Sequence, residues 1–373
     1  MNTPNFIFMQ LIGNQTEWAK AYALLHIINE GNIYFYKDNF QNEYSFYPVS
    51  KLIRNDECGK ITYQLTPTEV LVRRGEETQR MPRIKCKNAA TEILSTLQET
   101  KESDYSVSNC DPILETLHYT WFQSTADDKS DFSVIYFDPE KEIAQRQEIT
   151  VCIKSKWNIL PANRANNLKY DIQNVKFSNP ESNRINRIDG AQEVQQRLTE
   201  IYRLGGKLKY TTAENKFFLE NLCMIDLHFP KLLAEITRLF YTTGLSAIPE
   251  IITEIKNTNP YKIKEELIYK NNFYEYKVQQ LLYALATGLR STKRYRGYGH
   301  TRTFAIIDTC GEIELLDSTK RTEFDRYLYQ NAKLSMGNSK THKFGFVDVL
   351  LGCLVKIYIL QVRRWLCQKA FQA

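Results

Sequence analysis

One acid and one lysine on two neighbouring strand-like stretches are the residues of this chain whose types and spacing could carry out chemistry. If the turn between the stretches is centred near Glu142 and Ile143, antiparallel pairing puts Asp131 directly opposite Lys154, with both side chains on one face and about 5 Å apart. A carboxylate that holds Mg²⁺ beside a lysine that orients water is the minimal core of a metal-dependent nuclease. A one-residue slip would send the side chains to opposite faces, so the inference depends on the register. The two stretches are Ser130–Phe137 and Ile149–Lys154.

The second metal ligand is missing from this hairpin. Two residues before Lys154, where such nucleases carry an acid, the chain has Cys152, which is a poor ligand for Mg²⁺. Glu17, on a predicted first helix, could supply a carboxylate if that helix packs beside Asp131, but Glu17 equally fits a capping box with Asn14. Both hairpin residues could also have a purely structural role. A turn-flanking aspartate is commonly solvated, and a lysine at a strand end is commonly an exposed edge charge.

The spacing of apolar residues predicts a mixed α/β fold that positions these side chains. A helix begins after the cap at Asn14 and ends at Gly31, and short strands and a second helix follow before the hairpin. Helices and strands continue to alternate towards the end of the chain. The expected strands lie at 33–36, within 44–87, and at 304–307, 313–316, 344–349 and 355–362, and the further helices at 89–97, 193–204, 232–241 and 278–289.

Composition excludes several classes of protein. The apolar fraction of 43% is ample for a core, and the eight cysteines form no CxxC pairs. The start of the chain lacks a signal-like apolar run, and the apolar stretch 346–362 is cut by Asp348 and Lys356. There is no zinc-type ligand spacing, Walker loop or Gly-x-Gly-x-x-Gly run. We therefore expect a cytoplasmic protein with free thiols, no membrane insertion and no nucleotide cofactor.

Positive charge is concentrated in one segment. The net charge of +6 permits a polyanionic partner without demanding one. The segment 290–302, RSTKRYRGYGHTR, carries lysine and arginine interleaved with tyrosines and contains no acid. Such side chains on a glycine-containing loop can neutralise phosphates and reach base edges, although a solvated loop is the alternative. The cations of this segment are Arg290, Lys293, Arg294, Arg296 and Arg302.

Short blocks along nearly the whole chain resemble the HpaII-type family of Type II restriction endonucleases. The segment from Gly13 to Arg54 looks like the start of that family, and further blocks follow in the same order. Their shared order and the total length carry the resemblance. The further blocks are Thr150–Ser155 with Asn163, Asn166 and Asn167, then Arg203–Leu208, Asn259-Pro260, Glu323-Phe324 with Tyr327-Leu328, and Ser339–Gly345.

The resemblance implies an α/β, PD-(D/E)XK-like nuclease core with a mixed central sheet flanked by helices, plus a C-terminal α/β region. It implies cleavage of double-stranded DNA with Mg²⁺ at a short palindrome, and CCGG is the best-known target of the family. Asp131 becomes the metal ligand, Lys154 the catalytic lysine, and Cys152 is less troubling because the family tolerates a non-acid there. We expect the catalytic core over 1–190 and DNA binding and specificity over 191–373. The departure at 156–158 leaves room for a different recognition site.

Base readout then falls to amides, arginines and a histidine. Arginine or lysine on guanine is the commonest specific pairing. His342 could contact phosphate beside Lys343, although a lone histidine is more often structural. A palindrome cut on both strands favours a homodimer, while a monomer can nick each strand in turn. The cognate DNA methyltransferase of the same system would protect the host. The candidates for DNA contact are Asn163, Asn167, Arg294, Arg296, His342 and Lys343.

Two alternatives remain at this point. A DNA-binding protein without catalysis would use the basic segment but not the hairpin. An RNA-processing nuclease would use the same chemistry on RNA.

Overall fold

The chain divides into two compact units in the computed structural model. Unit 1 comprises Met1–Trp157, Thr301–Glu323 and Leu366–Ala373, and unit 2 comprises Asn158–His300 and Phe324–Trp365. This division falls after Trp157, and a later segment of the chain returns to unit 1. The residues that the structure describes are 10–36, 46–57, 59–124, 130–161, 163–190, 192–297, 302–335, 345–348, 354–358 and 363–364.

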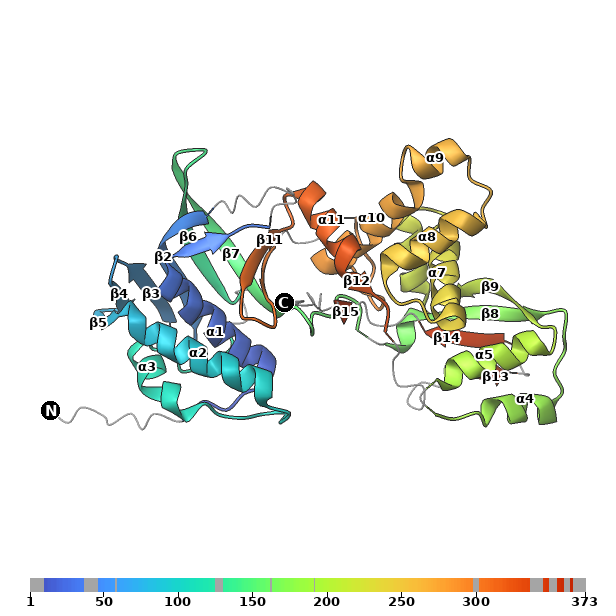
Figure 1. The fold of residues 1–373 in the computed structure, drawn as a ribbon, viewed down its shortest axis with the longest axis horizontal. Helices are drawn as coiled ribbons and strands as arrows, with labels where there is room; N and C mark the ends of the chain where they lie inside the picture. The colour runs from blue at the N-terminus through green and yellow to red at the C-terminus, as the bar shows by residue number, and fades with distance from the viewer. Residues whose placement is uncertain are drawn as a thin grey trace, which may run out of the picture. The chain divides into compact units, whose positions relative to one another are not determined.

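Unit 1 is built on a nine-stranded sheet covered by helices (Figure 1). The strand order is β11-β10-β7-β6-β2-β3-β4-β5, with β1 paired to β2; β10 runs parallel to β7 and the other neighbours are antiparallel. The expected mixed sheet flanked by helices is confirmed. The elements are α1 (Gln15–Glu30), β1 (Asn32–Tyr34), β2 (Phe46–Asp56), β3 (Gly59–Leu65), β4 (Glu69–Arg74), β5 (Glu77–Pro82), α2 (Arg83–Glu99), η1 (Ser108–Cys110), α3 (Asp111–Thr116), β6 (Phe132–Asp138), β7 (Ile143–Ile153), β10 (Thr303–Ile307) and β11 (Ile313–Asp317).

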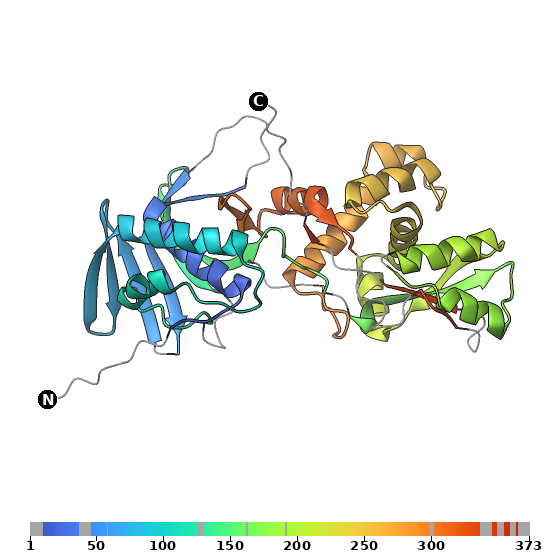
Figure 2. The ribbon, with the colours of Figure 1, turned by 60° about the horizontal axis from the view of Figure 1, so that its bottom comes forward.

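The first helix starts and stops where the sequence predicts. The Asn14 side chain accepts from the N–H groups of Thr16 and Glu17, and Glu17 accepts from the Asn14 N–H, which completes a capping box. Gly31 ends the helix with φ 65°, a left-handed conformation that glycine adopts without strain. Trp18 and neighbouring apolar residues of α1 are buried in the core of unit 1, so the helix is fixed against the sheet. Figure 2 shows α1 and α2 lying together across the strands.

The hairpin of β6 and β7 forms, but its predicted register is wrong. Phe132 lies opposite Ile149 and Asp138 opposite Ile143, so the turn is centred between Glu140 and Lys141. Asp138 explains this register, because its carboxylate accepts from the N–H of Glu140 and lies 3.3 Å from Lys141 Nζ, which closes the turn earlier than expected.

Asp131 is therefore level with the segment before Lys154 rather than with Lys154 itself. It donates its N–H to Ile149 O and accepts from Val151 N–H. Lys154 lies three residues beyond Val151, roughly 10 Å along an extended strand. The directly opposed pair that the pattern predicted is not formed.

Unit 2 holds a four-stranded sheet of order β13-β14-β8-β9 and most of the helices. The predicted helices near 193–204, 232–241 and 278–289 are confirmed as α5, α7 and α10, and the predicted C-terminal strand pair as β13 and β14. The elements are η2 (Arg164–Asn166), β8 (Asn167–Gln173), α4 (Asn179–Asn186), α5 (Glu193–Arg203), β9 (Lys207–Ala213), α6 (Lys216–Ile225), α7 (Phe229–Thr243), α8 (Ile248–Thr258), α9 (Glu265–Tyr269), α10 (Phe273–Thr287), β12 (Ala332–Lys333), β13 (Val347–Asp348), β14 (Leu354–Tyr358) and β15 (Arg363–Arg364), while α11 (Arg321–Asn331) crosses the division between the units.

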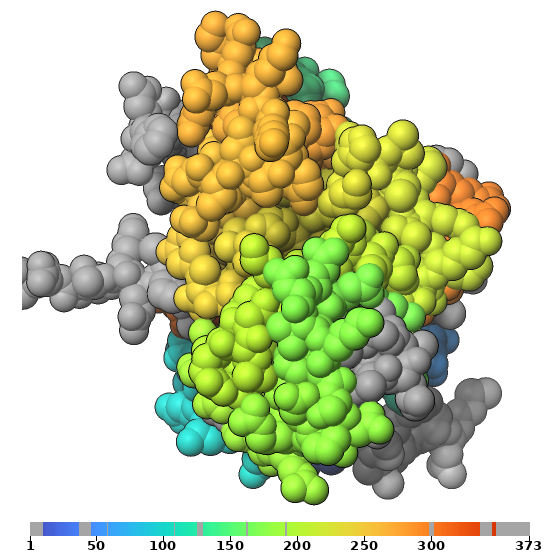
Figure 3. Space-filling model, turned by 90° about the vertical axis from the view of Figure 1, so that its right-hand side faces the viewer, coloured from blue at the N-terminus to red at the C-terminus, as the bar shows by residue number. Residues whose placement is uncertain are grey.

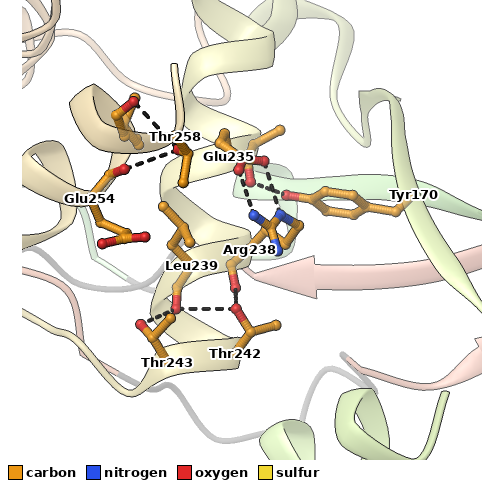
Figure 4. Close-up of polar contacts among 10 residues, drawn as sticks. Tyr170, Glu235, Arg238, Leu239, Thr242, Thr243, Glu254 and Thr258 are labelled. Carbon is orange, nitrogen blue, oxygen red and sulfur yellow. Dashed lines mark hydrogen bonds and ion pairs between the residues drawn. The ribbon is translucent and has the colours of Figure 1, made fainter. Parts of the chain in front are cut away.

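A buried polar contact ties the sheet of unit 2 to its central helix. The Tyr170 hydroxyl on β8 donates to Ala234 O on α7 at 2.8 Å. Glu235, the next residue of α7, accepts two hydrogen bonds from the guanidinium of Arg238, one turn further along the helix (Figure 4). Burial raises the pKa of Tyr170 well above its usual range. Each of these polar groups already has a partner within the protein, so the cluster is structural.

Figure 3 shows one face of unit 2, where green and yellow-green residues lie below the orange residues around α9. Within the described part of the chain, no helix is both long enough and apolar enough to cross a bilayer.

Candidate active site and nucleic-acid interface

Asp131 is fixed by a cation on one oxygen and a peptide group on the other. Lys20 Nζ, on α1, lies 2.8 Å from Oδ1. Val151 N–H donates to Oδ2 at 2.8 Å. The two charged side chains are only 11% and 21% exposed, for Asp131 and Lys20 respectively. Because a poorly solvated charge is stable only when it is paired, Lys20 is the counter-ion of this carboxylate.

Lys154 directly follows β7, at the carboxyl end that β7 shares with its parallel neighbour β10. Its N–H donates to Ile307 O at 2.8 Å, next to the parallel pairing of β7 and β10. The Lys156 ammonium group contacts the Gln15 side chain in the first turn of α1. In open α/β sheets, ligands commonly bind outside the carboxyl ends of the strands. The start of α1 and the ends of β7 and β10 therefore form a place where a substrate could be bound.

Glu17 belongs to the same end of the unit, and its capping role is confirmed. Oε2 accepts from Asn14 N–H at 2.9 Å, and Glu17 lies one helical turn before Lys20, on the same side of α1. Burial raises the pKa of Tyr119 far above its usual range; Arg54 opposes that shift, while the charges of Asp131 and Glu17 add to it. Both carboxylates thus act on one buried hydroxyl group, although no direct contact joins them in the described structure.

Two charged residues at this end were not foreseen from the sequence. Lys20 lies three residues after Glu17, a spacing that puts both on one helix face. Asp308 directly follows β10, and the pairing of Ile307 with Ile153 puts it beside Lys154 in the register. The Asp308 Oδ1 accepts from the N–H groups of Cys310 and Glu312 at 2.8 and 2.9 Å. The available signal was an acid immediately after a buried strand.

The basic segment is divided between the units. Its described part in unit 2, Arg290–Gly297, is called the basic loop here. Lys293, Arg294 and Arg296 are exposed, and Arg294 lies 3.6 Å from Glu220 of α6. Arg290 instead donates to the carbonyls at the end of α10. Three of the predicted cations are thus presented to solvent. Arg302 belongs to unit 1, where its N–H donates to Ser318 Oγ.

The other predicted DNA contacts differ in accessibility. Asn163 is exposed, and its Oδ1 caps η2 by accepting from Ala165 N–H at 2.9 Å. Asn167 is only 1% exposed, so its side chain is covered in the described structure. His342 and Lys343 lie outside the described residues.

Comparison with known proteins identifies the family. The model of the HpaII restriction endonuclease family matches residues 14–362. The Type II restriction enzyme HpaII of Haemophilus parainfluenzae is 26% identical over 341 residues, which cover 90% of this chain and 93% of that relative. No solved structure matches. The resemblance of the ordered blocks is confirmed, and the chain belongs to the HpaII restriction endonuclease family of Type II site-specific deoxyribonucleases.

Proposed function

We propose that this restriction endonuclease hydrolyses double-stranded DNA with Mg²⁺ at a site built around Asp131 and Lys154. The observation that carries the proposal is Asp131 itself. Its carboxylate is nearly buried, lies beside the parallel strands β7 and β10, and is paired with the Lys20 ammonium group. The antiparallel strands β2, β6 and β7, with β10 parallel to β7 and α1 against them, are consistent with a PD-(D/E)XK-like core.

The donor set fits Mg²⁺ in the manner usual for phosphoryl chemistry. Mg²⁺ is commonly held by one or two carboxylates, with waters and substrate phosphates completing its shell. Asp131 supplies one carboxylate, and Glu17 or Asp308 would supply a second. Among the described residues, no cluster of three histidine, cysteine or acidic side chains forms a preassembled metal site. This fits an ion that is completed by DNA rather than one held in a protein cage.

Mg²⁺ held by Asp131 would supply Lewis-acid stabilisation of the negative charge that grows on the phosphate oxygens. The chain's own residues contribute position and charge. Val151 N–H and the end of β7 fix the Asp131 carboxylate, and Lys154 would place an ammonium group beside the attacked phosphate to orient water. Lys20 would keep Asp131 paired until DNA and metal arrive.

The finer features of the reaction follow from the family resemblance. We infer a short palindromic target, with CCGG as the first candidate, and protection of the host by a cognate methyltransferase. A homodimer would let two copies cut the two strands by symmetry. The exposed cations of the basic loop and Asn163 are the described candidates for DNA contact; the buried side chain of Asn167 is a weaker one.

The activity is tested by incubating the purified full chain with Mg²⁺ and unmethylated bacteriophage DNA. Discrete fragments are expected, and sequencing their ends gives recognition site, cut position and strand symmetry together. Cutting that persists in EDTA would contradict the metal requirement. Gel shifts without cutting would identify a DNA-binding protein lacking catalysis, and cutting of RNA alone would identify an RNA-processing nuclease.

The position of the active site is tested with Lys154→Ala. This variant should lose cutting while it still binds target DNA in Ca²⁺, because the ammonium group acts on the reacting phosphate. Lys141→Ala is the matched control, since it removes a lysine from the turn of the same hairpin, at the opposite end of β7, where it lies 3.3 Å from Asp138. Cutting by Lys154→Ala at the wild-type rate would place the active site elsewhere.

A further inference from the structure

A buried asparagine on α6 holds the basic loop through its backbone. Asn221 is 0% exposed, and its Nδ2 donates to Arg290 O at 2.9 Å and to Lys293 O at 2.8 Å. Its Oδ1 accepts from Tyr295 N–H at 2.7 Å. One neutral side chain thus satisfies three peptide groups of the basic loop. A buried amide with all of these bonds made is costly to replace, because truncation leaves each loop group without its partner.

The side chains of the loop are left on the outside by this arrangement. Lys293, Arg294 and Arg296 are exposed, while Asn221 engages only backbone atoms. The Arg294 guanidinium lies 6.0 Å from the centre of the Phe217 ring, also on α6. The helix therefore sets the path of the loop and leaves its cations available to a polyanion.

Order in the free protein matters for binding. Fixing the backbone of a flexible loop costs conformational entropy, and a flexible loop pays that cost when it meets its ligand. A loop already held in its bound path does not lose that entropy again. Phosphate contacts also fix the register of the protein on the duplex, so a flexible loop would position the other DNA contacts less precisely.

We propose that Asn221 is a positioning residue for DNA recognition, which holds the basic loop in its DNA-binding conformation before DNA arrives. The partner is the phosphate backbone of double-stranded DNA, so the inference rests on the proposed function. Asn221 acts through the loop and does not itself touch DNA.

The first experiment uses Asn221→Ala in the full chain. Hydrogen exchange of the peptide covering 286–297 should become faster, which reports the loss of the clamp independently of any function. In Ca²⁺, the affinity for a short DNA fragment that the wild-type protein cuts in Mg²⁺ should fall about tenfold or more. The slope of log affinity against log salt should change little, since the cations remain present.

Asn215→Ala is the matched control on the same helix. Asn215 caps α6 by accepting from the N–H groups of Phe217 and Phe218, so its removal weakens α6 without removing a hydrogen bond to the loop backbone. DNA affinity should stay near that of the wild type. An equal loss of affinity in both variants would mean that general loosening of α6 explains the effect, and would overturn the positioning role.

A combined Lys293→Ala, Arg294→Ala and Arg296→Ala variant tests the partner of the loop. The salt slope should fall by about 0.9 for each phosphate that the loop no longer neutralises. If the wild-type protein binds and cuts DNA but this variant or Asn221→Ala binds as tightly as the wild type, the inference fails while the proposed function stands. A wild-type protein that neither binds nor cuts DNA would overturn both.

Discussion

Asp131 in unit 1 and the basic loop in unit 2 are fixed by different kinds of contact. Asp131 is held through its charged side chain, by the Lys20 ammonium group and the Val151 N–H. The basic loop is held through its peptide groups by the neutral amide of Asn221, while Lys293, Arg294 and Arg296 are exposed and only Arg294 of these lies near an acid, 3.6 Å from Glu220, in the described structure. In one region the functional charge is paired and nearly buried, and in the other most of the charge is exposed.

This difference matches what each region would have to do. A carboxylate that receives a metal ion only with its substrate needs a counter-ion in the meantime, because a poorly solvated charge is costly when unpaired. A surface that meets a polyanion gains from cations whose charge is not already neutralised. Substitutions at Asp131 should therefore change the rate of cutting, and substitutions at the loop should change DNA affinity.

The largest effect is expected for Asp131→Asn. The amide can still accept from Val151 N–H, but it loses the charge that would hold the metal ion and that pairs with Lys20. Cutting in Mg²⁺ should fall by about 10³-fold or more, which corresponds to roughly 4 kcal/mol of transition-state stabilisation. Single-turnover cleavage measures the rate, and gel shifts in Ca²⁺ should show nearly unchanged DNA binding.

Asp138→Asn is the control for that variant, at the opposite end of the same strand. Asp138 is also buried and bonded, to Glu140 N–H and Gln145, so its loss tests whether damage to β6 alone abolishes cutting. The control should keep cutting near the wild-type rate. Loss of DNA binding rather than cutting in Asp131→Asn would break the contrast between the two regions.

Lys20→Met should change the site less than Asp131→Asn does, and it should strengthen metal binding rather than weaken it. Removing the positive charge next to Oδ1 takes away a competitor of any cation, so Mn²⁺ should bind the DNA-free protein several-fold more tightly. Calorimetric titration without DNA measures this directly. Lys141→Met, which removes a lysine from the opposite end of the β6–β7 hairpin, where it pairs with Asp138, should leave Mn²⁺ affinity unchanged. Unaltered binding in Lys20→Met would argue against a metal site at Asp131.

The second carboxylate is distinguished by comparing Glu17→Gln with Asp308→Asn. Each change removes one negative charge and preserves shape, so the structural contacts to Asn14 N–H or to the β10–β11 turn are largely kept. We expect the variant that loses a metal ligand to weaken Mn²⁺ binding by about tenfold, and the other to bind as the wild type does. Equal affinities in both would leave Asp131 as the sole carboxylate.

Local sequence patterns predict the ends of α1, the β6–β7 hairpin and the basic loop. The cap at Asn14, the stop at Gly31 and the existence of the β6–β7 hairpin depend on residues a few positions apart, and all three are confirmed. The grouping of cations in the basic loop is likewise a matter of composition. Such features depend on short-range hydrogen bonds and on spacing, which a single sequence displays.

Non-local contacts could not be foreseen in the same way. The register of the hairpin depends on how Asp138 closes its own turn, and the pattern allowed a different centre. Asp308 becomes relevant only because β10 lies parallel to β7, across about 150 residues of intervening chain. Asn221 looks like an ordinary polar residue of an amphipathic helix until the loop is folded over it. These placements are properties of the tertiary fold.

The smallest expected effect concerns acid stability, and it again separates the two units. In unit 1, burial lowers the pKa of His26 and of His118 below the usual histidine range. In unit 2, burial alone would raise the pKa of the Asp226 carboxyl group, but the hydrogen bonds from Lys277 and from the His228 N–H, together with the Lys277 charge, outweigh burial and lower that pKa. The histidines bind protons more readily in the unfolded chain, so unit 1 should lose stability as pH falls below about 6.5. The contribution of Asp226 is present above its unfolded pKa and should be lost only below about pH 4.

Tryptophan fluorescence can follow the acid response of unit 1, because three of the four tryptophans, Trp18, Trp121 and Trp157, belong to it, while Trp365 belongs to unit 2. Urea unfolding monitored in this way should show a lower midpoint at pH 5.5 than at pH 7, because these two values lie below and above the ordinary histidine pKa of about 6.5. His118→Gln should reduce that difference, because glutamine cannot take up the proton that the unfolded chain binds. A difference of the same size in His118→Gln would mean that the burial of His118 does not govern the acid sensitivity of unit 1.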